Sequence, residues 1–218
     1  MKILVTGARG QLGFDVIKEL NRRKIECLGV GFSDFDITDE KIATDFIVSY
    51  CPDAVIHCSA YTAVDDAEDN QERCREVNVN GTANIARACK SIAAKMLYLS
   101  TDYVFSGYGE NFYNETDPAG PLSVYGQTKL DGELLVKKIL DKYFIVRTSW
   151  VFGTNGRNFI KTMLKLSELQ DEVRVVSDQI GSPTYTADLA PLLCDMIITD
   201  NYGTYHATNR RLQLGRTG

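Results

Sequence analysis

A hydroxyl, a phenol and an ammonium group that could together move a proton lie close to one another in the sequence. Thr101 follows the apolar run 96–99, and Tyr125 and Lys129 open a segment with helical periodicity. A spacing of four places Tyr125 and Lys129 on one face of a helix. An ammonium beside a phenol lowers the pKa of the phenol from about 10 toward neutrality. We therefore expect a proton-delivery site with Tyr125 as its general acid, although this spacing also occurs by chance on many helices.

The segment 7–13 (GARGQLG) carries glycines between a β-branched run at 2–6 and a helical pattern. In a dinucleotide-binding turn of this kind, Gly7 would allow the tight turn and Gly10 the close approach of a pyrophosphate. Gly13 would let the helix pack tightly, and the free N–H groups at the helix start would hold the phosphates. Alone, the Gly-x-x-Gly-x-x-Gly spacing also suits a turn that is merely flexible.

The end of the second predicted strand, 26–31, bears on the choice of cofactor. An NAD site usually has an acidic residue there, which binds the ribose 2′-hydroxyl. Phe32 and Ser33 stand in that place, Asp34 and Asp36 follow slightly later, and no arginine marks a 2′-phosphate site. The sequence therefore leaves NADH and NADPH open.

Strand and helix patterns alternate along the chain, which predicts an α/β fold with a Rossmann-like, doubly wound parallel sheet. Further strands are predicted at 54–60, 95–99, 144–147 and 173–176, and helices at 39–50, 72–94, 125–140, 158–169 and 186–198. We expect a polar connection at 61–68 and a local use of the residues at 78–82, either a helix irregularity or a close approach to the next strand. The long irregular loop after Phe105 is typical of a substrate-side loop.

Parallel sheets bind ligands at the carboxyl ends of their strands, so the glycine turn, Thr101 and the Tyr125/Lys129 pair should converge there. This convergence predicts hydride transfer to a carbonyl. Tyr125 would protonate the carbonyl oxygen, Thr101 would polarise it, and Lys129 would bind the nicotinamide ribose.

Charge and cysteine content disfavour several classes of protein. The chain has 24 basic and 29 acidic residues, a net charge of −5 and no basic stripe, so we expect no nucleic-acid partner. Its apolar runs are too short for a membrane span. The six cysteines form no C-x-x-C pair and no signal peptide precedes the first strand, so we expect no metal site, no disulfide framework and a cytoplasmic location. His57 lies in an apolar run and is expected to be an interior residue.

The motifs taken together resemble the extended short-chain dehydrogenase/reductases and, among them, the dTDP-4-dehydrorhamnose reductase family. The resemblance covers residues 1 to 209 and is carried by segments 6–13, 60–65, 100–105, 125–129, 147–151, 158–159 and 178–184. It implies reduction of the 4-keto group of dTDP-4-dehydro-L-rhamnose by NADPH or NADH.

Site residues are implied by the same resemblance, position by position. The catalytic residues would be Thr101, Tyr125 and Lys129, and the sugar nucleotide would contact Thr101, Asp102 and Trp150. The residues along the cofactor would be Gly7, Gly10, Gln11, Leu12, Gly13, Asp36, Ile37, Ser59, Ala60, Tyr61, Leu99, Tyr125 and Lys129.

The resemblance also divides the chain into a cofactor-binding domain, 1–150, to which later segments return strands and helices, and a small substrate lobe, 151–218. Family members continue with a region that completes this lobe, and residues 210–218 do not resemble that continuation. We therefore expect a partial, truncated lobe. A second copy of the chain, as a homodimer, is one candidate partner.

Two other functions remain open from the sequence. One is a non-catalytic binding protein, similar to the reductase-like regulatory subunit of methionine adenosyltransferase. The other is an epimerase or dehydratase that acts on a different sugar nucleotide, for which Asp102 would be a suitable acid or base. The set of Thr101, Tyr125 and Lys129 favours an enzyme, and the matches at Gln11 and Trp150 favour the reductase.

Overall fold

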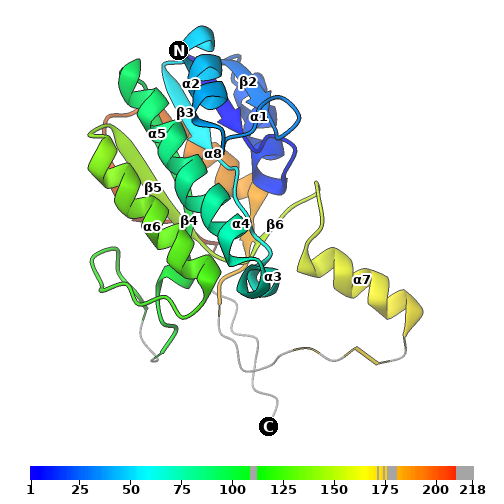
Figure 1. The fold of residues 1–218 in the computed structure, drawn as a ribbon. Coiled ribbons are helices and arrows are strands. Elements are labelled where there is room, and N and C mark those ends of the chain that lie inside the picture. The colour runs from blue at the N-terminus through cyan, green and yellow to red at the C-terminus, as the bar shows by residue number, and fades with distance from the viewer. Residues whose placement is uncertain (109–111, 171, 174, 176–180, 210–218) are drawn as a thin grey trace.

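A six-stranded parallel sheet forms the centre of the molecule (Figure 1). The computed structural model of the chain describes residues 1–108, 112–170, 172–173, 175 and 181–209. The strands are β1 (Lys2–Thr6), β2 (Glu26–Val30), β3 (Ala54–His57), β4 (Lys95–Thr101), β5 (Tyr143–Thr148) and β8 (Gly203–His206). Their order, β2-β1-β3-β4-β5-β8, changes direction between β1 and β3, which is the switch point where ligands bind in such sheets.

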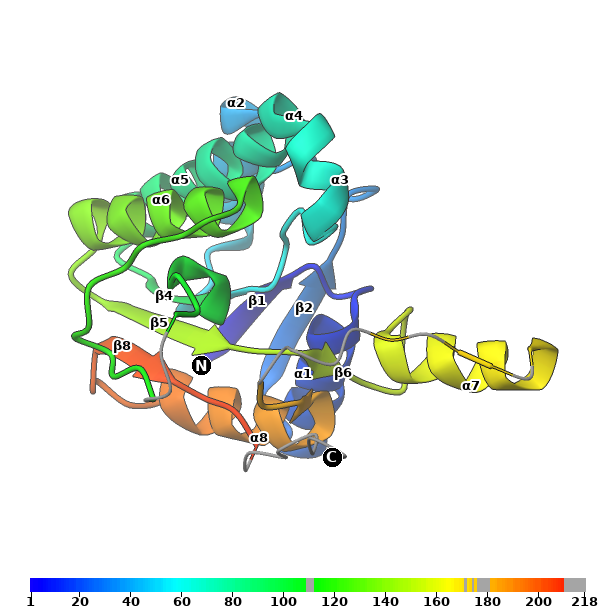
Figure 2. The ribbon, with the colours of Figure 1, turned by 90° about the horizontal axis from the view of Figure 1, so that it is seen from below.

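Helices cover both faces of this sheet (Figure 2). One face carries α1 (Gln11–Arg22) and α8 (Thr186–Ile197), and the other carries α2 (Glu40–Tyr50), α5 (Thr82–Ser91) and α6 (Val124–Ile139). Successive residues of β1 alternate between the two cores: Ile3 and Val5 belong to one, Leu4 to the other. Burial on both faces explains the continuous apolar runs in the sequence and confirms the predicted doubly wound fold.

The first five predicted strands correspond to β1–β5, while later segments differ from the predictions. β8 was missed, because Gly203–His206 is short and its residues are only half-buried. The strand predicted at 173–176 falls partly outside the described residues, and Val173 and Val175 lie in no strand. Residues 61–68 are not simply a polar connection, since they contain most of helix α3 (Val64–Asp69).

The irregularity expected at 78–82 is a π-helical turn, Glu76–Gly81, between α4 (Gln71–Arg75) and α5. Asn78 lies within this turn, and its side chain forms hydrogen bonds with two segments outside it. Asn78 donates to the carbonyl of Tyr61 at 3.1 Å and to the hydroxyl of Thr128 at 3.1 Å, and it accepts from the Tyr61 N–H at 2.7 Å. At the end of the turn, a Cβ on Gly81 would lie 2.7 Å from the side chain of Ile37. The expected helix irregularity is therefore present, while the close approach is to the connection after β2 and not to the next strand.

The described residues between 151 and 185 lie outside the six-stranded sheet. They contain a short two-stranded parallel sheet of β6 (Val151–Phe152) and β7 (Thr184–Tyr185). Helix α7 (Phe159–Leu169) lies between these two strands in the sequence. Helix α7 buries none of its residues and stands away from the sheet in both views (Figures 1 and 2). In the part of the chain that is described, no helix combines the length and hydrophobicity needed to cross a membrane.

A buried ion pair connects α6 to the central strands. Arg147 on β5 donates to Glu133 on α6 through Nη2 at 2.7 Å and Nε at 2.9 Å, with both side chains almost fully buried. The Ser100 hydroxyl also donates to Glu133, at 2.6 Å, and Arg147 reaches the Glu115 carbonyl at 3.3 Å. One carboxylate thereby ties together α6, β4 and β5, and its partner reaches the loop that follows β4.

Removing one member of this pair should destabilise the protein strongly. Glu133→Gln leaves the Arg147 guanidinium buried without its counter-charge, and we expect a loss of about 3–5 kcal/mol in the free energy of unfolding. Urea denaturation followed by circular dichroism measures it. Asp45→Asn is the control, because it breaks the exposed Lys41–Asp45 pair and should cost less than about 1 kcal/mol. A loss for Glu133→Gln as small as that of the control would contradict the structural role.

Candidate functional site

An open cavity of about 800 Å³ lies at the carboxyl ends of the strands. It receives residues from the ends of β1 to β5 and from the starts of α1 and α6. Every site residue predicted from the sequence lines it except Tyr61: Gly7, Gly10, Gln11, Leu12, Gly13, Asp36, Ile37, Ser59, Ala60, Leu99, Thr101, Asp102, Tyr125, Lys129 and Trp150. The structure thus brings these residues together, while their individual roles remain predictions.

The glycine turn passes directly over β3 and leaves the start of α1 open. Gly7 has φ +67°, and a Cβ there would lie 2.7 Å from the Ser59 nitrogen, so only glycine fits. A Cβ on Gly13 would lie 2.3 Å from the Gly7 carbonyl oxygen. Gly10 caps α1 without any side-chain hydrogen bond. The free N–H groups of the first helical turn are therefore available for a phosphate, and the turn fits a dinucleotide.

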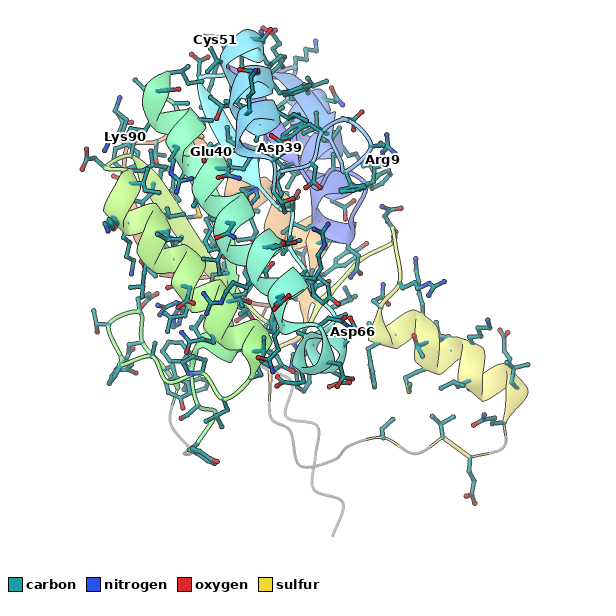
Figure 3. The ribbon with its side chains drawn as sticks, viewed as in Figure 1. Arg9, Asp39, Glu40, Cys51, Asp66 and Lys90 are labelled. Atoms are coloured by element: carbon teal, nitrogen blue, oxygen red, sulfur yellow. The ribbon has the colours of Figure 1, made fainter. Side chains whose placement is uncertain are left out.

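Arg9 changes the interpretation of the end of β2. The fold brings its side chain against Gly31, where an ideal Cβ would lie 3.5 Å from the Arg9 Cδ, and places Nη2 3.6 Å from the Asp34 carboxylate. Figure 3 shows Arg9 at the surface, and its side chain is 72% exposed. The fold therefore places an arginine beside the end of β2, where the sequence pattern showed none. This position of Arg9 could not be predicted from the sequence, because Arg9 belongs to the glycine turn after β1 and not to β2.

Tyr61 does not line the cavity, although it was expected along the cofactor. Its hydroxyl donates to Asp66 on α3, and its backbone is held at both N–H and carbonyl by Asn78. The unpredicted helix α3 explains the difference, because it supplies the acceptor that draws the phenol away. Thr62 and Val64 line the cavity in its neighbourhood instead.

Thr101 and Tyr125 meet where β4 ends and α6 begins. The Thr101 hydroxyl accepts from the Tyr103 N–H at 3.2 Å and donates to Asp102 at 3.1 Å. Ser123 caps α6 by accepting from the Gly126 N–H at 3.1 Å. A Cβ on Gly126 would lie 2.2 Å from the Tyr103 carbonyl oxygen, so this glycine allows the helix to begin against the end of β4.

Burial controls the ionisation of Tyr125. It raises the pKa of the phenol above its ordinary value, and a hydrogen bond with Thr101 lowers it only in part. The expectation that Lys129 lowers this pKa toward neutrality is wrong, because the Lys129 ammonium lies over the ring of Tyr98, 4.1 Å from its centroid. Tyr125 therefore keeps its proton at neutral pH, as a proton donor must before the reaction.

Trp150 occupies a strained position at the wall of the cavity. It has φ +45°, a conformation that costs a non-glycine residue about 1–3 kcal/mol. Gly181 packs on the indole, where a Cβ would lie 2.5 Å from Cε2, and the Thr184 N–H donates to the Trp150 carbonyl at 3.2 Å. Ser149 is fixed beside it by a 2.7 Å hydrogen bond to the Ser182 carbonyl. The backbone around Trp150 is thus held in place where the residue lines the cavity.

Other residues of the cavity were not expected from the sequence. Two aromatic and two basic side chains are the clearest: Phe32, Phe35, Arg73 and Arg157. Of these four, only Phe32 could have been expected from its position, because it directly follows a predicted strand. The other three are brought to the cavity by tertiary contacts that the sequence does not indicate. His57 is an interior residue, as predicted: it is 1% exposed, its Nδ1 lies 2.7 Å from the Thr6 hydroxyl, and burial lowers its pKa to about 3. Within the described residues, no three His, Cys, Asp or Glu side chains cluster as a metal site would require.

Comparison with known proteins extends the resemblance over nearly the whole chain. Residues 1–214 match the family model described as the RmlD substrate binding domain. The dTDP-4-dehydrorhamnose reductase of Aggregatibacter actinomycetemcomitans is 44% identical over 214 residues, which are 95% of this chain and 73% of that protein.

Solved structures agree. A dTDP-4-dehydrorhamnose reductase from Clostridium acetobutylicum has a TM-score of 0.94 at 43% identity, over 96% of this chain and 75% of that one. The enzyme of the same name from Bacillus anthracis, in complex with NADP, has a TM-score of 0.93 at 42% identity, over 96% of this chain and 76% of that one. On this match, the chain belongs to the dTDP-4-dehydrorhamnose reductase family.

Proposed function

We propose that this chain reduces the 4-keto group of dTDP-4-dehydro-L-rhamnose to the hydroxyl of dTDP-L-rhamnose, with NADPH or NADH as the reductant. One observation carries the proposal: the hydroxyls of Thr101 and Tyr125 meet in the same cavity as a glycine turn that fits a dinucleotide. The names of the relatives and the NADP bound to the Bacillus anthracis enzyme support it.

A bound nicotinamide cofactor supplies the hydride that is transferred to C4 of the sugar. The start of α1 would hold the pyrophosphate through its free N–H groups, with Gly7, Gly10 and Gly13 keeping the backbone close to it. Lys129 faces the cavity one helical turn after Tyr125 and would hold the ribose hydroxyls. These residues orient the cofactor and take no part in proton transfer.

The proton that balances the hydride comes from Tyr125, whose hydroxyl would transfer it to the developing O4 alkoxide. Thr101 donates a hydrogen bond to the same oxygen, and the developing charge strengthens that bond in the transition state. Without substrate that hydroxyl donates to Asp102 at 3.1 Å, so its single proton would turn from the carboxylate to O4 when the sugar binds. Burial raises the pKa of Asp102, and the hydrogen bond from Thr101 opposes this rise. Trp150 presents an aromatic face that suits a sugar or a base.

We expect Tyr125→Phe to lower kcat/KM by about 10²–10⁴-fold, the usual contribution of a positioned general acid. The assay follows NADPH oxidation at 340 nm with dTDP-4-dehydro-L-rhamnose. Binding of NADPH, measured by the fluorescence of the cofactor, should change little, because the substitution removes only a hydroxyl.

Tyr202→Phe is the matched control for this substitution. It removes the phenolic hydroxyl that donates to Asp200 at 2.7 Å and that does not line the cavity. We expect wild-type turnover from it. Full activity of the Tyr125→Phe variant, or wild-type protein that turns over with neither NADPH nor NADH, would refute the proposed function.

Arg9 should favour NADPH over NADH. Its contact with Asp34 is long and exposed, so the guanidinium can turn to a 2′-phosphate at little cost. We expect Arg9→Ser to weaken NADPH binding by about tenfold, equivalent to ~1.4 kcal/mol, and to leave NADH binding unchanged. Isothermal titration calorimetry with both cofactors measures this difference.

Asp34→Asn provides the opposite test, since it removes the carboxylate that competes for Arg9 and repels a phosphate. NADPH should then bind more tightly relative to NADH. If both cofactors lose affinity equally in Arg9→Ser, the residue supports the glycine turn and does not recognise the 2′-phosphate.

A further inference from the structure

We propose that the ring of Tyr98 is the positioning group of Lys129: it holds the ammonium in its charged form and aims it at the cofactor side of the cavity. Lys129 serves the ribose only if the proposed function holds, so this inference rests on that function. Tyr98 itself does not line the cavity, and its effect on the cofactor acts through Lys129.

The geometry is that of a cation held against an aromatic face. Lys129 Nζ lies 4.1 Å from the centroid of the Tyr98 ring, well within the ~6 Å reach of such an interaction. The ring is fully buried and stacks on His57, with centroids 5.9 Å apart and planes 19° apart. Its hydroxyl donates to the Lys129 carbonyl at 3.3 Å. The ring is therefore fixed relative to the backbone that carries the ammonium.

Helix α6 approaches the ring closely enough to enforce this contact. A Cβ on Gly132 would lie 2.4 Å from the Tyr98 hydroxyl oxygen and 3.0 Å from the Asn78 carbonyl oxygen. Glycine at this position lets the helix settle on the aromatic side chain. Lys129, one turn earlier on the same face, is thereby brought over the ring.

The contact of Lys129 Nζ that the geometry defines is the face of the Tyr98 ring. Glu133 is on the same face of α6, but its oxygens accept from Arg147 and Ser100. The charge of Glu133 is matched by that of Arg147. Glu133 nevertheless raises the pKa of Lys129 through its charge, against the lowering by burial.

The remaining titratable groups around Lys129 come from β3, α4 and the start of α6. Burial lowers the pKa of His57 to about 3 and raises that of Cys58 to about 12, and it also raises the pKa of Tyr125. All three are neutral at pH 7. The Cys74 thiol faces Lys129 from α4 and lies 3.3 Å from the Thr128 hydroxyl. Glu133 and the aromatic face therefore both favour the charged ammonium, and the Tyr98 ring is the one that Lys129 Nζ contacts.

This support matters because burial works against the charge. It lowers the pKa of Lys129 to about 7, with an opposing influence from Glu133. A lysine that titrates near neutrality responds to any further change in its surroundings. Replacing the ring removes a stabiliser of the charged form, so the pKa should fall and the ammonium should be lost at lower pH than in the wild type.

The test is a direct titration of Lys129. Lysine labelled with ¹³C at Cε is followed by NMR between pH 5 and 10 in the full chain, and the Lys129 signal is assigned by its absence in Lys129→Arg. We expect Tyr98→Phe, which keeps the ring, to titrate as the wild type does. Tyr98→Leu should titrate about one pH unit lower, a tenfold change in proton affinity. An unshifted Tyr98→Leu titration would overturn the proposal.

Fluorinated phenylalanines at position 98 cover the case in which Tyr98→Leu does not fold. Successive fluorine atoms withdraw charge from the ring face and leave its shape almost unchanged. A stepwise fall in the pKa of Lys129 from unsubstituted to trifluorinated ring supports the proposal. A pKa that does not follow the number of fluorine atoms contradicts it, because a purely structural role depends on shape alone.

The same variants separate this inference from the proposed function. The NMR titration needs neither cofactor nor substrate, so it is valid even if the chain reduces no sugar nucleotide. If the function holds as well, NADPH binding in Tyr98→Leu should weaken at a pH about one unit lower than in the wild type. A shifted titration together with wild-type pH dependence of NADPH binding would show that Lys129 does not serve the cofactor.

Discussion

The close contact between α6 and β4 is the constraint on which the site depends. Gly132 has no side chain, so α6 can pack directly on Tyr98. The close packing of α6 on β4 in turn fixes the positions of Lys129 and Glu133, which flank Gly132 on the helix. One turn earlier, Lys129 extends over the aromatic ring and into the cavity. Glu133 follows and enters the core, where Arg147 and Ser100 hold it. A helix seated even slightly higher would lose the ion pair and the contact beneath the ammonium together.

Burial then determines the ionisation of the residues that this contact brings together. It disfavours the charged form of every group, so it raises the pKa of Tyr125 and lowers that of Lys129. The sequence-based expectation assigned the adjustment of Tyr125 to the lysine charge. In the folded protein, the hydrogen bond with Thr101 is what lowers the pKa of the Tyr125 phenol. The Lys129 ammonium contacts the Tyr98 ring instead.

Local patterns made a large part of the fold predictable. The apolar runs of β1–β5 and the periodicity of α2 and α6 depend on neighbours in the sequence, and they were placed within a few residues. One predicted helix over 72–94 corresponds to α4, the π-helical turn and α5 together. β8 was missed because an edge strand of four half-buried residues carries little pattern. Helix α3 was missed because the acidic segment 65–69 has the composition of a polar connection. Asp66 on this helix accepts a hydrogen bond from the Tyr61 hydroxyl, which explains why Tyr61 does not line the cavity.

The sequence by itself determined the inventory of the site: a glycine turn, two hydroxyls and a lysine at the ends of parallel strands, with a tryptophan nearby. Spacing along one chain is enough for that, because strand ends in a parallel sheet meet at one edge. Tertiary structure alone decided that Arg9 lies at the end of β2 and that Tyr98 lies beneath Lys129. It also decided which groups keep their protons. These properties depend on contacts between residues far apart in the sequence and on the exclusion of water, neither of which leaves a local pattern.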